Sequence, residues 1–275
     1  MPHASASDGV QLHWEERGSG PAVILVAYWS LAPSVWSPIT AELERDHRVI
    51  RYDDRGTGRS ERVGPYDQDT CASDLEAVIE AADAAPAIAI CVMDGSNRAV
   101  RVAERRPDLI SHVVAPGGMP LSRRAISGTD AMVGSNVVVG AFMKQLETDY
   151  RGAVRGIMEA ANPQMTQDEL RARVSDQVEH VPLEVASERI REWAEDEAAA
   201  ECARELGDRM VVLLSPRVTG GWFPEPHVME RMLAEYFPEA VLEEIEDGMI
   251  SRPDCTAAVV RRLTAARALN VESQS

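Results

Sequence analysis

Short apolar stretches recur along the chain and are separated by helical patterns. Residues 10–16 (VQLHWEE) alternate between apolar and polar positions, as in a half-buried antiparallel strand. Residues 22–27 (AVILVA) are apolar at every position, which is typical of a central strand covered on both faces. Further buried strands are predicted at residues 48–52, 87–92, 112–115, 210–214 and 241–245. Helical patterns lie between most of them, so the chain predicts an α/β fold with a doubly wound, mostly parallel sheet.

The character of the chain changes between residues 120 and 206. Strand patterns stop there, and two charged amphipathic helices are predicted at residues 166–180 and 183–206. We interpret residues 120–206 as a helical lid inserted into a core domain formed by residues 1–119 and 207–275. Such an insertion is expected to lie over the strand ends, where open α/β sheets bind ligands.

Charge and composition exclude several classes of partner. The 275 residues carry a formal net charge of −17, and such a surface repels nucleic acid and anionic membranes. Residues 1–8 lack the features of a signal peptide, and the longest apolar run, residues 22–29, is too short to span a bilayer. We therefore expect a cytoplasmic protein with neither a nucleic-acid partner nor a membrane.

The cysteines give no sign of a metal site or a disulfide framework. They are Cys71, Cys91, Cys202 and Cys255. They are scattered, with no CxxC spacing and no histidine at ligand spacing, so buried reduced thiols are expected. No metal and no cofactor is predicted from the sequence.

The stretch from residue 87 to residue 107 (AIAICVMDGSNRAVRVAERRP) has an unusual layout. It combines a buried strand, a sharp turn at Met93-Asp94-Gly95 and a helix that ends before a proline. This is the layout of a nucleophile elbow, the strand-to-helix turn that presents a catalytic nucleophile, but without the nucleophile.

Residues 52–60 (YDDRGTGRS) closely match the YDxRGxGxS turn of the α/β-hydrolase superfamily, which the chain resembles. Other landmarks agree in order and spacing: Trp36 after the first core loop, Asp74-Leu75 before the elbow strand, and Arg106-Pro107 after the elbow helix. The resemblance covers nearly the whole chain and implies an α/β-hydrolase fold in which the helical insertion is the lid. It also implies that the YDDRGTGRS turn is framework, with glycines for backbone freedom and with Arg55 and Asp53 tying loops together.

The positions that the resemblance assigns to catalysis hold unsuitable residues. Met93 occupies the position of the nucleophile, and a thioether has no proton for a base to remove. The loop of the catalytic acid, residues 215–222 (SPRVTGGW), contains no carboxylate, and the loop of the histidine, residues 246–252 (EDGMISR), contains no histidine. Ala27-Tyr28 replaces the usual His-Gly of the oxyanion region. These departures predict a degenerate triad and disfavour an ordinary serine hydrolase.

Two residues of the elbow helix could take over a chemical role. Asp94 could be a displaced nucleophile, a general acid or base whose pKa is raised by apolar neighbours, or a cap of the helix N-terminus. Ser96 could be a relocated nucleophile or, as we prefer, a residue whose hydroxyl caps the helix. The sequence leaves these alternatives open.

An apolar lining is predicted around the elbow for a small-molecule ligand beneath the lid. Asp94 is the candidate catalytic residue. The candidate substrate-binding residues are Tyr28, Trp29, Met93, Ser96, Trp222 and Met249. Trp29 and Trp222 fall in loops at the C-terminal ends of strands, where pockets of such folds lie.

Three hypotheses for function follow. The first is a cofactor-independent, non-hydrolytic enzyme, such as a cyclase, isomerase, lyase or decarboxylase, acting on an apolar molecule of specialised metabolism. The second is a non-catalytic pseudo-hydrolase that binds a small molecule or a partner protein. The third is a hydrolase whose nucleophile has moved to Asp94 or Ser96.

Overall fold

An eight-stranded sheet forms the centre of the molecule. The computed structural model describes residues 2–26, 33–116, 140–161, 165–215, 226–246 and 252–274. The strands are β1 (His3–Ser5), β2 (Gln11–Arg17), β3 (Ala22–Val26), β4 (Arg48–Tyr52), β5 (Ala87–Cys91), β6 (Ile110–Pro116), β7 (Met210–Leu214) and β8 (Val241–Glu244). Their order is β1-β2-β4-β3-β5-β6-β7-β8. β2 pairs antiparallel with β1 and β4, and all other pairs are parallel.

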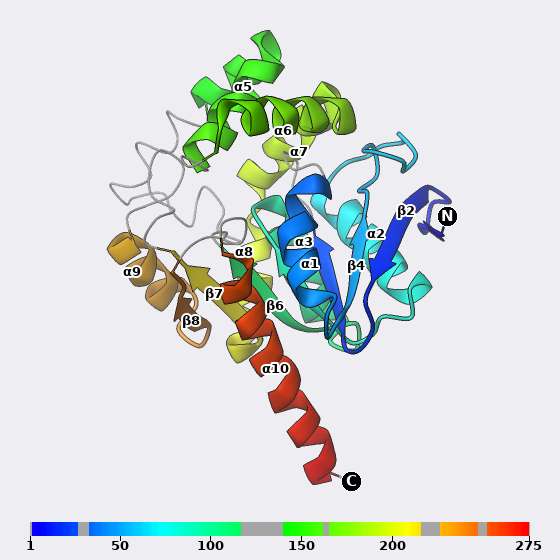
Figure 1. Cartoon of the computed structure of the whole chain (residues 1–275), viewed down its shortest axis with the longest axis vertical. Helices are drawn as coiled ribbons and strands as arrows, with labels where there is room; N and C mark the ends of the chain where they lie inside the picture. Colours follow the sequence, from blue (N-terminus) through cyan, green and yellow to red (C-terminus); the bar gives the residue numbers. More distant parts are fainter. Residues whose placement is uncertain are drawn as a thin grey trace.

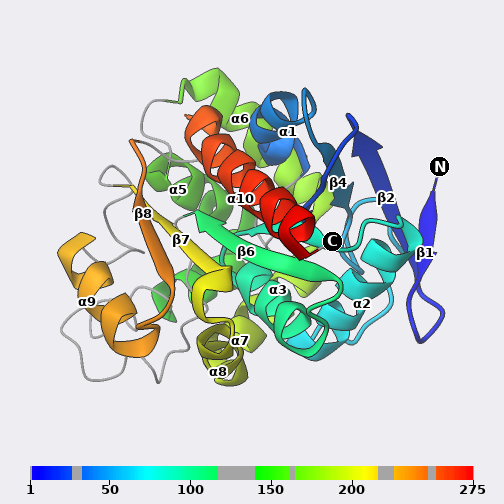
Figure 2. The ribbon, with the colours of Figure 1, turned by 90° about the horizontal axis from the view of Figure 1, so that it is seen from below.

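Helices cover both faces of this sheet. Outside the segment between β6 and β7, the helical elements are η1 (Pro33–Trp36), α1 (Ser37–Leu43), α2 (Gln68–Ala81), α3 (Asp94–Arg105), α9 (Pro226–Tyr236) and α10 (Pro253–Gln274). In β3, Ile24 and Val26 join the apolar core under α2, α3 and α9, whereas Val23 and Leu25 join the core under α1 and α10. Alternate residues of a strand point to opposite faces, so a strand that is apolar throughout is buried on both sides. Figure 2 shows α1 and α10 on one side of the sheet and α2 and α3 on the other.

The fold class and the strand positions predicted from the sequence are confirmed. Each of the seven predicted strands is present within one or two residues of its predicted bounds. The prediction missed β1, which is three residues long and therefore too short to give a periodic pattern.

The described part of the chain between β6 and β7 is helical. It contains α5 (Tyr150–Ala161), α6 (Gln167–His180), α7 (Leu183–Glu195), α8 (Ala198–Glu205) and the short turn η2 (Gly207–Arg209). α6 begins where the sequence predicts, because Thr166 and Glu169 form a reciprocal capping box. Figure 1 shows α5 and α6 stacked over one end of the sheet.

The single helix predicted over residues 183–206 is two helices. Asp196 ends α7, and its Oδ1 accepts a hydrogen bond from the backbone N–H of Ala199 at 3.3 Å, which caps the start of α8. Ala199 and Ala203 of α8 then pack into the same apolar core as α3. α5 and α6 enclose a small core formed by Val154, Met158, Leu170 and Val174, and Ala153 of α5 joins a second core with Val185, Ala186 and Ile190 of α7.

Candidate functional site: the turn after β5

Met93 lies in a strained turn between β5 and α3. β5 ends at Cys91, α3 begins at Asp94, and Met93 has φ 52° and ψ −125°. A non-glycine residue in such a sparsely populated region costs on the order of 1–3 kcal/mol and persists only where the surrounding structure enforces it. The predicted layout of strand, sharp turn and helix is therefore confirmed. The Met93 side chain is half-buried and packs against the core beneath α1 and α10.

Asp94, the first residue of α3, lies in surroundings different from those expected. Its side chain is fully buried, and its Oδ2 accepts hydrogen bonds from Arg98 Nη1 at 2.7 Å and from Arg189 Nη2 at 2.7 Å. The expected apolar neighbourhood is thus corrected to one containing two guanidinium groups. Asp94 is also the acidic residue in the first turn of α3, which is the placement that the helix-cap alternative expects, and that alternative stays a prediction.

Asp54 completes this arrangement. Its Oδ2 lies 2.9 Å from Arg189 Nη1 and 3.4 Å from Arg98 Nη2. We call the four residues Asp54, Asp94, Arg98 and Arg189 the elbow clamp. Each of their side chains is at most 3% exposed, and their formal charges sum to zero.

The electrostatics of the elbow clamp keep both guanidinium groups charged. Burial disfavours the charged form and lowers the pKa of Arg98, but the carboxylates of Asp54 and Asp94 more than offset this, and the pKa lies well above its usual value. The pKa of Arg189 is raised by the same two carboxylates, against burial and the repulsion of Arg98. The clamp is therefore a pair of mutually dependent ion pairs in the interior of the protein.

The other potential nucleophiles near the elbow are enclosed. The side chain of Ser96 is fully buried, and its hydroxyl lies near the Cys91 thiol. The Ser96 hydroxyl makes no hydrogen bond to the backbone of α3, so the preferred prediction that it caps the helix is wrong. Burial raises the pKa of the Cys91 thiol to about 12, and it has the same effect on Cys71, so both are protonated near neutral pH.

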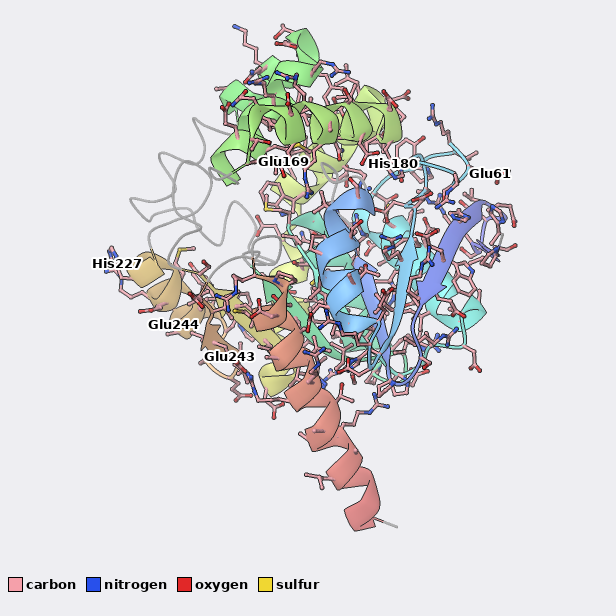
Figure 3. The ribbon with its side chains drawn as sticks, viewed as in Figure 1. Glu61, Glu169, His180, His227, Glu243 and Glu244 are labelled. Carbon is pink, nitrogen blue, oxygen red and sulfur yellow. The ribbon has the colours of Figure 1, made fainter. Side chains whose placement is uncertain are left out.

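One histidine meets the core at the junction with the inserted helices. His180, the last residue of α6, places Nε2 3.4 Å from Asp53 Oδ1, in the turn after β4. Burial raises the pKa of Asp53, but hydrogen bonds from His180 and from the backbone N–H of Arg59 more than offset this and lower the pKa. His227 is exposed near the start of α9, and Figure 3 shows it on the far side of the molecule from His180.

The YDDRGTGRS turn has the framework role predicted for it. Gly58 has φ 49°, and a Cβ at this position would lie 2.3 Å from the His180 ring, so only glycine fits. Arg55 and Asp53 both tie loops together as expected, although with separate partners. Arg55 pairs with Asp74 and Asp8, while Asp53 pairs with His180.

Comparisons with known proteins place this geometry in a known fold. No family model matches the chain. The chain is 38% identical over 81 residues to a non-heme haloperoxidase of Rhodococcus erythropolis, a match that covers 29% of this chain and 30% of the relative. It spans less than half of the length of the first curated relatives it matches.

Solved structures match over nearly the whole chain. An esterase from Exiguobacterium antarcticum has a TM-score of 0.77 at 17% identity and covers 95% of this chain and 98% of its own. A bromoperoxidase from Bacillus anthracis has a TM-score of 0.73 at 18% identity, with 98% and 100% covered. The chain has the α/β-hydrolase fold. The strained turn at Met93 has the strand, turn and helix layout of a nucleophile elbow.

Several predicted features of this α/β-hydrolase-fold protein lie outside the described residues. The candidate lining residues concerned are Tyr28, Trp29, Trp222 and Met249. Most of the loops that the resemblance assigns to the catalytic acid and the histidine lie outside as well, so the degenerate triad stays a prediction. Arg252, the last residue of the second loop, pairs on the surface with Glu246 and Asp254.

The described ranges contain neither a helix that could span a membrane nor a cluster of potential metal ligands. Within them, no helix is long and apolar enough to cross a membrane. Also within them, no three His, Cys, Asp or Glu side chains gather in a way that could hold a metal ion.

The partners of Asp94 were not predicted from the sequence. Arg98 follows Asp94 by four residues, the spacing at which oppositely charged side chains meet on a helix, so this contact had a local signal. Arg189 lies 95 residues further along the chain and belongs to another helix. No local pattern links it to the elbow.

Proposed function

We propose that the protein binds an apolar small molecule beside the elbow and performs no covalent chemistry there. The observation that carries this proposal is Met93 in the strained turn, where the fold ordinarily presents a nucleophile. A thioether is a poor acyl acceptor, but it offers a polarisable apolar surface to a ligand.

The surroundings of Met93 support binding rather than proton transfer by Asp94. The Asp94 carboxylate accepts hydrogen bonds from two buried guanidinium groups, so it is engaged with other groups of the protein. A general acid or base needs to reach the substrate, whereas Asp94 is fully enclosed. This favours the non-catalytic hypothesis over the enzyme that uses Asp94.

A non-hydrolytic enzyme is the second candidate, and one observation favours it. His180 and Asp53 form an imidazole–carboxylate pair, the arrangement in which a carboxylate orients a histidine for proton transfer. The His180 side chain is 16% exposed, so solvent reaches part of the ring. A reaction that needs a single proton carrier could use this pair.

A binding experiment with an uncharged apolar fluorophore, N-phenyl-1-naphthylamine, tests the proposal. We expect saturable binding at one site, weakened roughly tenfold by Met93→Gln because the amide adds a polar group to an apolar contact. The matched control is Val63→Gln, since Val63 is 50% exposed and lies on the loop before α2. It should leave the affinity unchanged.

Turnover measurements separate the candidates. The proposal expects p-nitrophenyl acetate and butyrate to hydrolyse at the rate of buffer alone. Enzyme-dependent hydrolysis would contradict it, and so would an affinity for the fluorophore that Met93→Gln and Val63→Gln change equally. Loss of a measured turnover in His180→Gln would favour the second candidate.

A further inference from the structure

Two ion pairs join the elbow helix α3 to the inserted helix α7 at matching positions. Arg189 Nη2 of α7 lies 2.7 Å from Asp94 Oδ2, and Asp196 Oδ1, at the C-terminal end of α7, lies 2.6 Å from Arg101 Nη2. The partners of each pair are separated by 95 residues in sequence. Because this separation is constant, α3 and α7 run side by side in the same direction.

The two pairs form a ladder with two rungs. On each helix the rung residues are seven positions apart, which corresponds to two helical turns and about 10 Å, so both rungs lie on one face. The charges are reversed between the rungs: α3 carries the acid in the first and the base in the second. Figure 2 shows α7 and α8 lying beside α3.

The ladder is buried and supported by neighbours. At the first rung Asp54 also contacts Arg189, and at the second Asn97 Nδ2 donates to Asp196 Oδ2 at 2.7 Å. Shifting α7 by one turn along α3 would bring a residue such as Val185 or Trp193 opposite Asp94. Each buried charge would then lack its partner, and unpaired buried charges are strongly unfavourable.

We propose that this ladder locks the register of α7 on α3, so that α7 is a fixed wall beside the elbow and not an opening lid. Buried ionic groups are best attested in this role of setting register. α5 packs against α7, because Ala153 shares an apolar core with Val185, Ala186 and Ile190. α6 contacts the rest of the chain through Asp176 with the Ser34 hydroxyl and through His180 with Asp53.

Hydrogen exchange of the full chain, followed by mass spectrometry without any ligand, tests this inference independently of the proposed function. In the wild type, we expect the amides of α7 to exchange as slowly as those of α3. If the amides of α7 exchange more than about tenfold faster than those of α3, the register lock does not exist.

Substitutions at the first rung sharpen the test. Arg189→Met should speed the exchange of α7 roughly a hundredfold or more, because Asp54 and Asp94 then share only Arg98. Arg191→Met is the matched control, since Arg191 lies on the same helix but is exposed, and it should leave α7 unchanged. Equal exchange rates of the α7 amides in Arg189→Met and Arg191→Met would overturn the proposal.

Two more variants keep the test decisive if Arg189→Met does not fold. Arg189→Lys retains the charge but loses the forked hydrogen bonds, so it should fold and still exchange faster in α7 than Arg191→Lys. Asp94→Asn with Arg189→Met leaves Asp54 and Arg98 as a neutral pair. This double variant should therefore restore slow amide exchange in the first turn of α3 but not in α7. Slow amide exchange in α7 would contradict a direct link between Arg189 and the register of α7.

Discussion

Asp94→Asn is expected to lower the free energy of unfolding by about 3–5 kcal/mol, the usual cost of removing one partner from a buried ion pair. Asparagine leaves Arg98 and Arg189 facing the single carboxylate of Asp54, so the buried elbow clamp acquires an uncompensated positive charge. Urea denaturation at neutral pH, followed by tryptophan fluorescence and by circular dichroism, measures the change.

The matched control is Asp168→Asn in α6, where the side chain of Asp168 is 87% exposed and pairs with the neighbouring Arg171 on the surface. Exposed pairs contribute between zero and about 1 kcal/mol, so this variant should resemble the wild type. If Asp94→Asn is as stable as Asp168→Asn, the elbow clamp does not hold the elbow and Asp94 becomes available for a chemical role.

Arg55→Met is expected to cause a loss of similar size, about 3–5 kcal/mol at pH 7. Arg55 is 1% exposed and donates to both carboxylate oxygens of Asp74, at 2.6 and 2.7 Å, which ties the turn after β4 to α2. Without Arg55, the carboxylate of Asp74 is buried with no compensating charge. Adding Asp74→Asn should recover at least half of the loss.

The loss in Arg55→Met should depend on pH in a defined direction. Burial already raises the pKa of Asp74 in the presence of Arg55, and removal of the guanidinium raises it further. A carboxyl whose pKa is higher in the folded than in the unfolded state costs stability when ionised, and the cost falls as the pH drops from neutral toward about 4. The deficit relative to Arg55→Met/Asp74→Asn should therefore shrink on acidification, and a constant deficit would contradict this assignment.

Much of the fold could be predicted from the sequence because buried parallel strands leave a direct signal. Residues 48–52 and 210–214 are predicted with the bounds that the structure has. The elbow was also predictable, since an apolar strand, a glycine-containing turn and a helix follow each other within one short stretch. The three residues of β1 and the break at Asp196 were not, because a short strand has no period and the break depends on a cap and a distant arginine.

The candidate site was less predictable, and the reason is again physical. A sequence shows that Asp94 follows the turn, but not that its carboxylate points back toward Arg98 and across to Arg189. Whether such a side chain faces a ligand or the interior depends on charges that other elements bring. Asp54 and Arg189 come from a loop and a helix that meet only in the folded chain.

Labelling with a fluorophosphonate probe tests the central claim, that the elbow presents no nucleophile, most directly. The full chain is incubated with excess probe, and its intact mass is measured together with the peptide that spans residues 87–105. We expect no adduct on the wild-type chain, because a thioether occupies the turn and the Ser96 hydroxyl is fully buried. A stoichiometric adduct on this peptide that Ser96→Ala abolishes would contradict the account.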